Sequence, residues 1–211
     1  MGKAVSRCVI LAAAPVEDVA PLRPLLCPDD VFVAADGGLV LADALGVRPL
    51  RVVADFDSAS FTPNDAPVTR LPVRKDITDT AAALRWARAQ GYTDFLLLGG
   101  LGGRLDHEYA NICTAVEAAR AGCRLMLADG RNRVFAAVSS PLTIPAQPGW
   151  HLSFFAFDAP VRGLTLRGVE YELTDYALLP EDPLCVSNGF AAGQATVTFT
   201  EGTLLVFLSR D

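Results

Sequence analysis

The chain has 211 residues, of which 51% are hydrophobic and 20% charged, and its formal net charge is −6. This composition predicts a folded globular protein of one large domain or two small ones and excludes an intrinsically disordered chain. The acidic balance argues against binding to nucleic acid or to an anionic membrane, because both rely on basic surfaces. No stretch of the sequence reaches the roughly 18 apolar residues that a membrane-spanning helix needs.

The five cysteines are odd in number and show no Cys-x-x-Cys spacing. They predict reduced core residues of a cytoplasmic protein, not a disulfide framework or a zinc site. The apolar run Cys8–Ala14 superficially resembles a signal peptide. Arg7, Glu17 and Asp18 flank it closely, however, and favour a buried first strand.

The first part of the chain alternates between strand-like and helix-like segments. The predicted strands are 7–13, 31–35, 51–54, 95–98, 124–127 and 133–138, and the predicted helices are 39–45, 78–90 and 106–121. Gly46, Gly91 and Gly122 follow the helices as stop signals. This order predicts an α/β domain over residues 1–138, with a mostly parallel sheet covered by helices. In such sheets, ligands bind beyond the carboxyl ends of the strands.

The composition changes near Ser139, where prolines interrupt the helical pattern. Short strand candidates follow at 151–157, 163–166, 170–173, 194–200 and 203–208. Glu201-Gly202 separates the last two and predicts a hairpin turn. We therefore expect residues 139–211 to form a C-terminal all-β sandwich domain, or a partial barrel.

Two acidic clusters follow or precede predicted elements. Asp55-Phe56-Asp57-Ser58 comes directly after the predicted strand 51–54, and alternation would place both carboxylates on one side, as metal ligands. An Asx turn that caps a helix is the local alternative. Lys75-Asp76-Ile77-Thr78-Asp79 opens a helix, and its acidic residues also fit ordinary capping and dipole compensation. Lys75 is either a solvated charge or a phosphate contact.

Two glycine-containing turns also stand between a strand and a helix. Ala35-Asp36-Gly37-Gly38 either lets the backbone approach a ligand or forms a simple turn capped by Asp36. Gly99-Gly100-Leu101-Gly102-Gly103-Arg104 precedes Asp106 and His107 and matches neither the P-loop nor the dinucleotide-binding spacing. Its backbone N–H groups and the arginine fork suit phosphate, whereas tight turn geometry is the alternative.

Several carboxylates on one rim stay ionised together only beside a cation, because like charges raise each other's pKa. Mg²⁺ takes oxygen ligands and usually combines one or two carboxylates with substrate phosphates. The acidic clusters and the glycine turn with its arginine therefore indicate Mg²⁺-nucleotide chemistry. In the β half, Ser187-Asn188-Gly189-Phe190 is either a plain Asn-Gly turn or a polar ligand contact.

In combination, these motifs resemble the thiamine pyrophosphokinase family, from Ala34 to Phe207. That family has an Asp-Gly-Gly turn and then Gly-Asp-Phe-Asp-Ser, Lys-Asp-x-Thr-Asp, Gly-Gly-Arg-x-Asp-His and Ser-Asn-x-Phe segments, and their order and rough spacing match here. Three residues depart from the family pattern: Leu50 replaces the usual Asp, Ala54 the usual Gly and Gly189 the usual Glu. The last lies in the segment that would contact thiamine.

The resemblance implies transfer of a pyrophosphoryl group from ATP to the hydroxyl of thiamine, which gives thiamine diphosphate and AMP, with Mg²⁺ as cofactor. It implies catalytic, metal-binding roles for Asp55, Asp57 and Asp79, and it makes Asp106 a base, an orienting group or a further metal ligand. Nucleotide or phosphate contacts are implied for Asp36, Gly37, Gly38, Lys75, Thr78, Gly102, Gly103, Arg104 and His107. Thiamine contacts are implied for Ser187 and Asn188.

The resemblance also implies a homodimer with active sites at its interface. Two rival functions remain open: a pyrophosphokinase that acts on another acceptor, such as a hydroxymethylpterin, and a non-catalytic module that senses nucleotide or thiamine. The sequence contains all five aspartates of these motifs: Asp55, Asp57, Asp76, Asp79 and Asp106. They favour an enzyme, because a sensor has no need to keep metal-binding carboxylates.

Overall fold

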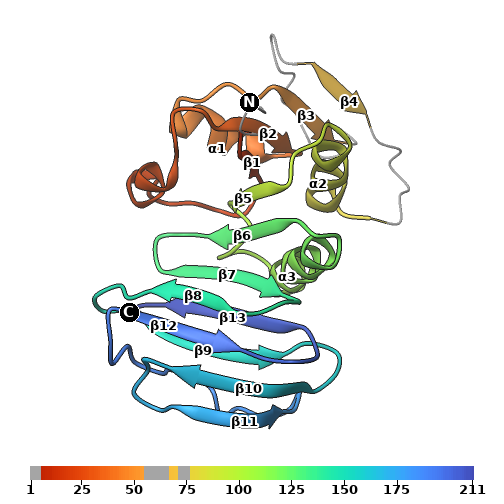
Figure 1. Ribbon diagram of the computed structural model, residues 1–211. Helices are drawn as coiled ribbons and strands as arrows, with labels where there is room; N and C mark the ends of the chain where they lie inside the picture. Colours follow the sequence, from red (N-terminus) through yellow and green to blue (C-terminus); the bar gives the residue numbers. More distant parts are fainter. Residues whose placement is uncertain (1–5, 55–66, 71–76) are drawn as a thin grey trace, which may run out of the picture. The chain divides into compact units, whose positions relative to one another are not determined.

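The computed structural model describes residues 6–54, 67–70 and 77–211 and divides the chain into two compact units (Figure 1). The first unit comprises residues up to 118 together with 122–130, and the second comprises 119–121 and 131–211. This division groups the strand β7 (Asn132–Ala137) with the second unit, whereas the boundary expected after residue 138 assigned it to the α/β domain.

The described residues of the first unit form six parallel strands in the order β4-β3-β2-β1-β5-β6. The strands are β1 (Cys8–Leu11), β2 (Val31–Ala35), β3 (Arg51–Ala54), β4 (Val68–Arg70), β5 (Asp94–Leu98) and β6 (Arg124–Ala128). All four residues of β1 are buried. A strand covered on both faces reads as a continuous apolar run instead of an alternating one, which explains the sequence of β1.

Helices cover this sheet as expected. They are α1 (Gly38–Leu45), α2 (Asp79–Ala89) and α3 (Leu105–Arg120), and a short 3₁₀ helix, η1, spans Ala20–Leu25. Leu41 and Leu45 of α1 and Leu22 of η1 share one core with Val9 and Leu11 of β1. Contacts join α2 to β1, β2 and β3, and Figure 1 shows it on the other side of the sheet from α1.

The strand order reverses at β1. Strands β2, β3 and β4 follow it on one side, and β5 and β6 lie on the other. In open α/β sheets, the crevice at the carboxyl ends beside such a switch point is where ligands bind. The topology therefore predicts a ligand site formed by the segments that follow β1, β2 and β5.

In the second unit, β7, β13 and β9 pair antiparallel in that order as part of the nine-stranded sheet, and β11-β10-β12-β8 form a separate antiparallel sheet. The remaining strands are β8 (Leu142–Pro145), β9 (His151–Ala156), β10 (Val161–Arg167), β11 (Leu173–Leu178), β12 (Gln194–Thr198) and β13 (Leu204–Ser209). Phe154 and Val206 from one sheet pack in a single core with Leu164 and Val197 from the other. The predicted fold class, an α/β domain followed by a β-sandwich, is confirmed.

Three details of the second unit differ from the sequence-based expectation. The hairpin predicted at Glu201-Gly202 is wrong, because β12 and β13 belong to different sheets and this turn connects the two layers. The strand predicted at 170–173 lies later, as β11. Strand β8, which ends at Pro145, was not expected from the sequence. Strand β8 is at the edge of its sheet, where a proline is tolerated because no ladder donor is needed there.

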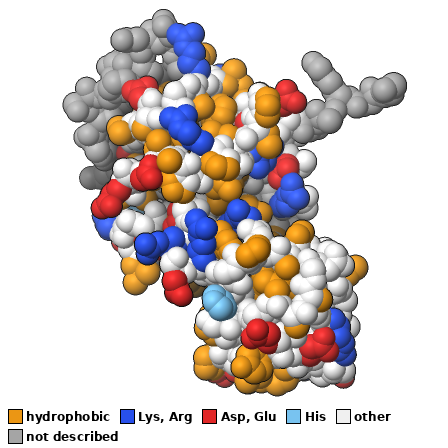
Figure 2. All heavy atoms as spheres, turned by 90° about the vertical axis from the view of Figure 1, so that its left-hand side faces the viewer, with side chains coloured by type: hydrophobic (Ala, Val, Ile, Leu, Met, Phe, Trp, Pro, Cys, Tyr) orange, Lys and Arg blue, Asp and Glu red, His pale blue; other side chains and the backbone are white. Residues whose placement is uncertain are grey.

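Other sequence-based expectations concern the cysteines and the surface. No disulfide joins the five cysteines, all of which lie in the described ranges, but only Cys8 and Cys185 are buried. None of the helices in those ranges has the length and apolar character needed to cross a membrane. Acidic and basic side chains are interspersed over the face of the molecule shown in Figure 2.

Candidate active site

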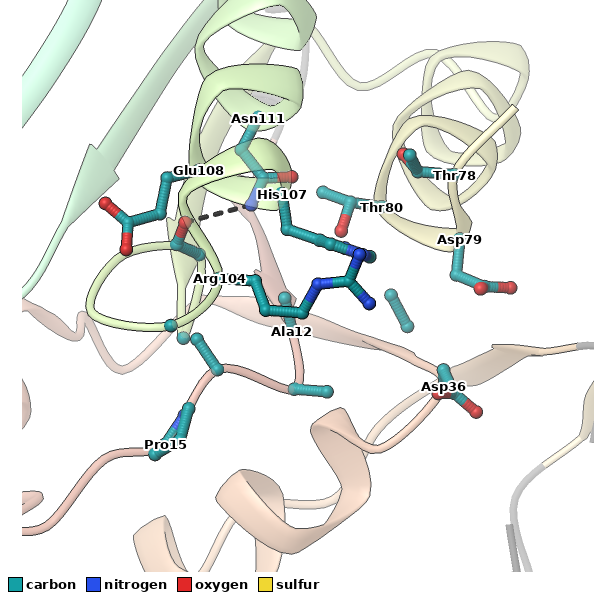
Figure 3. A pocket seen from close by; sticks show the side chains of 16 residues that line it. Ala12, Pro15, Asp36, Thr78, Asp79, Thr80, Arg104, His107, Glu108 and Asn111 are labelled. Carbon is teal, nitrogen blue, oxygen red and sulfur yellow. Dashed lines mark hydrogen bonds between the residues drawn. The ribbon is translucent and has the colours of Figure 1, made fainter. Parts of the chain in front are cut away.

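A cavity of about 380 Å³ lies in the first unit at the carboxyl ends of β1, β2 and β5 (Figure 3). Its walls come from the segments that follow these strands and from the N-terminal turns of α2 and α3. The volume is within the range of small-molecule sites, roughly 300–1,000 Å³. The cavity thus occupies the place that the sheet topology indicates.

Glycines allow the turns around this cavity to pack against the end of β1. A Cβ atom at Gly38 would lie 1.9 Å from the carbonyl oxygen of Leu11, and one at Gly99 would lie 2.4 Å from that of Ala12. Gly99 also has a φ of 68°, in the region that favours glycine. Gly37, Gly38 and Gly102 are not among the residues that line the cavity. Of the glycines predicted to contact nucleotide, Gly103 does line it.

Asp36 stands directly after β2 and lines the cavity. Its φ is 46°, and its backbone N–H donates to the carbonyl of Val53 at 2.9 Å. The Oδ1 atom of Asp36 is buried and has no hydrogen-bond partner within the described part of the chain. A buried carboxylate oxygen without a partner is costly, so the site calls for a donor or a cation at this atom.

The start of α2 contributes Thr78 and Asp79, and both line the cavity. The Thr78 hydroxyl accepts a hydrogen bond from the backbone N–H of Ala81 at 3.2 Å, as the N-cap of the helix. Asp79 occupies the first turn, where the helix dipole favours a negative charge. The local capping explanation therefore holds for Thr78, and the same turn presents the Asp79 carboxylate on the side of the cavity where Asp36 lies (Figure 3).

Arg104 reaches across the cavity from the start of α3 (Figure 3). Its Nε and Nη2 atoms donate to the two carboxylate oxygens of Asp106 at 3.1 and 2.6 Å. This hydrogen bond raises the pKa of Arg104 and lowers the pKa of Asp106. Both side chains are exposed to solvent, and Asp106 is not among the residues that line the cavity. The structure thus places Asp106 beside Arg104 and outside the cavity wall.

Three residues of α3 complete the wall: His107, Glu108 and Asn111. His107 was expected at the site from the sequence, whereas Glu108 and Asn111 were not. Asn111 is only 6% exposed, and its Nδ2 donates to the carbonyl of Gly100 at 2.9 Å, drawn as a dashed line in Figure 3. Its position one helical turn after His107, on the same face, is the sequence signal that could have revealed it.

Asp55, Asp57 and Lys75 lie outside the described residues, so their predicted roles stay predictions. Within the described ranges, no group of three or more histidine, cysteine, aspartate or glutamate side chains is arranged to hold a metal ion. Two carboxylates that line the cavity, Asp36 and Asp79, nevertheless provide the oxygen donors that Mg²⁺ prefers. The unpartnered oxygen of Asp36 is consistent with a cation at this end of the cavity.

The predicted thiamine-contacting segment belongs to the second unit. Ser187 is exposed with a φ of 57°, and its backbone N–H donates to the Ser153 hydroxyl at 3.0 Å. Asn188 is 4% exposed, and its side-chain amide is bonded to the backbone of Tyr171: Oδ1 accepts from the N–H at 3.0 Å and Nδ2 donates to the carbonyl at 2.8 Å. The side chain of Asn188 therefore holds the backbone of Tyr171 in place, and its contact with thiamine stays a prediction.

Two family models match the chain. The thiamin pyrophosphokinase catalytic domain matches residues 22–127, which is half of the chain, and the thiamin pyrophosphokinase vitamin B1 binding domain matches residues 141–204. A thiamine pyrophosphokinase from Bacillus subtilis (strain 168) is 26% identical over 209 residues, which cover 96% of this chain and 98% of that protein.

Solved structures agree with these matches. The crystal structure of thiamine pyrophosphokinase from Bacillus subtilis has a TM-score of 0.90 at 25% identity and covers 98% of this chain and 100% of its own. The thiamin pyrophosphokinase structure from Geobacillus thermodenitrificans has a TM-score of 0.86 at 28% identity, with coverages of 97% and 98%. The yeast thiamin pyrophosphokinase structure, with a TM-score of 0.80 at 13% identity and coverages of 99% and 87%, shares the fold. The chain belongs to the thiamin pyrophosphokinase family.

Proposed function

We propose that this protein transfers a pyrophosphoryl group from ATP to the hydroxyl of thiamine and so produces thiamine diphosphate and AMP. The observation that carries the proposal is the cavity at the ends of β1, β2 and β5, where carboxylates, a glycine turn and Arg104 face one space. Such a transfer depends on positioning and charge neutralisation more than on covalent catalysis. The match to a vitamin B1 binding domain supports thiamine as the acceptor.

In this proposal, Arg104 and the backbone N–H groups of the glycine turn hold the polyphosphate. Asn111 fixes the turn through its hydrogen bond to Gly100. When phosphate takes the fork of Arg104, the Asp106 carboxylate loses the partner that lowers its pKa. Asp106 then becomes a stronger base and accepts or orients the proton of the thiamine hydroxyl.

We propose Mg²⁺ as the cofactor, held by Asp79 together with Asp55 and Asp57, with Asp36 close by. The ion, when bound, supplies positive charge that neutralises the phosphate oxygens. Two of the carboxylates line the cavity, and one has a buried oxygen without a described partner, which supports the assignment. Chelation should abolish AMP production, and added Mg²⁺ should restore it. Full activity in excess chelator would contradict the metal assignment.

The acceptor is tested by measuring AMP formed from ATP in three reactions: with thiamine, with a hydroxymethylpterin, and with no acceptor. The proposal predicts AMP only in the reaction with thiamine. AMP formed with the pterin instead would identify a related pyrophosphokinase. No AMP in any of the reactions, with nucleotide and thiamine still bound, would identify a sensing module.

We further propose a cytoplasmic homodimer in which each active site uses parts of two copies. The motifs that handle nucleotide lie in the first unit, whereas Ser187 and Asn188 lie in the second. A two-fold interface uses the same surface on each copy and creates two equal sites.

A further inference from the structure

The segment around Asn188 is joined to residues 168–171 by an antiparallel set of contacts. The backbone N–H of Glu170 donates to the carbonyl of Gly189 at 2.9 Å, and that of Ala191 donates to the carbonyl of Gly168 at 3.0 Å. The side-chain amide of Asn188 fixes both backbone groups of Tyr171. These contacts hold Glu170 and Tyr171 in place beside the turn predicted to bind the acceptor.

The carboxyl group of Glu170 fills the space that a side chain at position 189 would use. A Cβ atom at Gly189 would lie 2.4 Å from Cδ of Glu170 and 2.6 and 2.7 Å from its two carboxylate oxygens. The φ angle of Gly189 is not positive, so its backbone conformation does not require a glycine. The position of the Glu170 carboxyl group therefore explains why a residue without a side chain fits at position 189.

The Glu170 carboxylate has no hydrogen-bond or ion-pair partner within the described part of the chain, and its side chain is exposed. The neighbouring Glu172 differs, because it accepts from the N–H of Gly168 at 2.9 Å and lies 3.7 Å from Arg167. Tyr171, next to Glu170, is 72% exposed. An exposed carboxylate without a partner attracts a cation, because a charge-assisted contact is stronger than a neutral one.

We infer that Glu170 is a specificity-determining residue that supplies, from a different segment, the carboxylate that position 189 lacks in this chain, and that it pairs with the cationic thiazolium ring of thiamine. The inference deepens the proposed function and rests on it. The family pattern that the sequence resembles has Glu where this chain has Gly189, and here the carboxyl group of Glu170 lies where a Cβ atom at position 189 would be.

The test compares Glu170→Gln, the double variant Glu170→Ala with Gly189→Glu, and Glu181→Gln as a control at another exposed glutamate of the second unit. Each is assayed with thiamine and with an uncharged thiamine analogue that has a thiophene ring in place of the thiazolium. An exposed ion pair contributes at most about 1 kcal/mol, so the KM for thiamine should rise roughly 5-fold in Glu170→Gln, with little change in kcat. The KM for the analogue should not change.

The double variant removes the Glu170 carboxyl group that a side chain at position 189 would meet and returns a carboxylate from position 189 itself, so it should recover most of the wild-type KM for thiamine. Glu181→Gln should match the wild type. An unchanged thiamine KM in Glu170→Gln, or an equal rise for the uncharged analogue, would overturn the inference. Titration calorimetry of thiamine alone separates this result from the proposed function. If the wild type forms no AMP, the proposed function fails. In that case, a lower affinity for thiamine in Glu170→Gln than in the wild type would still support the cation site. Equal affinities of the two proteins, or no thiamine binding by the wild type, would overturn it.

Discussion

Arg104 holds Asp106 in a fork of two hydrogen bonds, from Nε to Oδ1 at 3.1 Å and from Nη2 to Oδ2 at 2.6 Å. The two residues are separated by one position, and both side chains are exposed. A planar fork of this kind binds a phosphate as readily as a carboxylate. In the proposed reaction, the triphosphate competes with Asp106 for the same donors, so binding of one substrate prepares the base for the other.

The first prediction concerns Arg104. Replacing it with alanine should lower kcat/KM for ATP by on the order of 10²-fold, because a donor to the transferring group is lost. Arg104→Lys should recover only part of this activity, since an ammonium group keeps the charge but lacks the fork. Thermal melting should remain unchanged, because the fork is exposed. Wild-type kinetics for ATP in Arg104→Ala would show that Arg104 does not bind the triphosphate.

A second prediction concerns the close approach of Gly38 to Leu11. Gly38→Ala would place a Cβ atom 1.9 Å from a backbone oxygen, which cannot move as a side-chain end can. We expect unfolding free energy to fall by about 1–3 kcal/mol, in the range for overpacking. Gly193→Ala is the matched control, because a Cβ atom there meets nothing within 4 Å. Denaturant titration of both variants gives the comparison, and equal stabilities would refute the steric argument.

Much of the first unit could be predicted because each element has a local signal. Strand β2 and strand β3 have the predicted bounds, since each is a short apolar run that ends at a polar residue. The site follows from the same logic, because parallel strands bring their carboxyl ends to one edge of the sheet. Asp36, Asp79 and Arg104 accordingly line a common cavity.

Features that depend on partners distant in the sequence could not be predicted. The order of local elements does not reveal that β12 and β13 lie in different sheets, because a Glu-Gly turn suits a hairpin and a crossing between layers equally. The displacement of β11 has a similar cause. Tyr171 is held by the side chain of Asn188, which lies 17 residues away, and the strand starts only after this contact. The contact between the Glu170 carboxyl group and Gly189 could not be predicted either, because the two residues are 19 positions apart in the sequence.

A third prediction links pH to the contact between α2 and α3. Arg85 donates to both carboxylate oxygens of Glu117, at 2.9 and 3.0 Å, and this hydrogen bond lowers the pKa of Glu117 below its ordinary value of 4.5. A lowered carboxyl pKa stabilises the folded state above pH 4.5, and the stabilisation is lost as the pH falls through the lowered value. Glu117→Gln should therefore be less stable at pH 7, by about 0.5 kcal/mol for a partly exposed pair.

Urea unfolding of the wild type and Glu117→Gln at pH 7 and at pH 3 measures this difference. The gap between the two proteins should narrow at the lower pH, because the wild-type carboxylate then approaches its neutral form. A gap that is equal at both pH values would show that the ionised hydrogen bond is not its source.

A fourth prediction tests the proposed dimer by complementation. Asp79→Asn removes a carboxylate from the cavity in the first unit, and Ser187→Trp blocks the exposed turn in the second unit. Each variant should be inactive alone. Heterodimers of the two should regain one intact site and part of the activity, because each intact half comes from a different copy. A dimer without rescue would place each site within one chain, and a fully active monomer in sedimentation would refute the dimer.

Phosphorus NMR of a single reaction mixture distinguishes pyrophosphoryl transfer to thiamine from other uses of ATP. With the protein, ATP, Mg²⁺ and thiamine, we expect AMP and thiamine diphosphate to appear together in equal amounts, without ADP. Equal amounts follow because one bond, between the α- and β-phosphoryl groups, is broken for each thiamine diphosphate formed. Accumulation of ADP with thiamine monophosphate, or of AMP with free pyrophosphate, would show that the protein does not transfer a pyrophosphoryl group to thiamine.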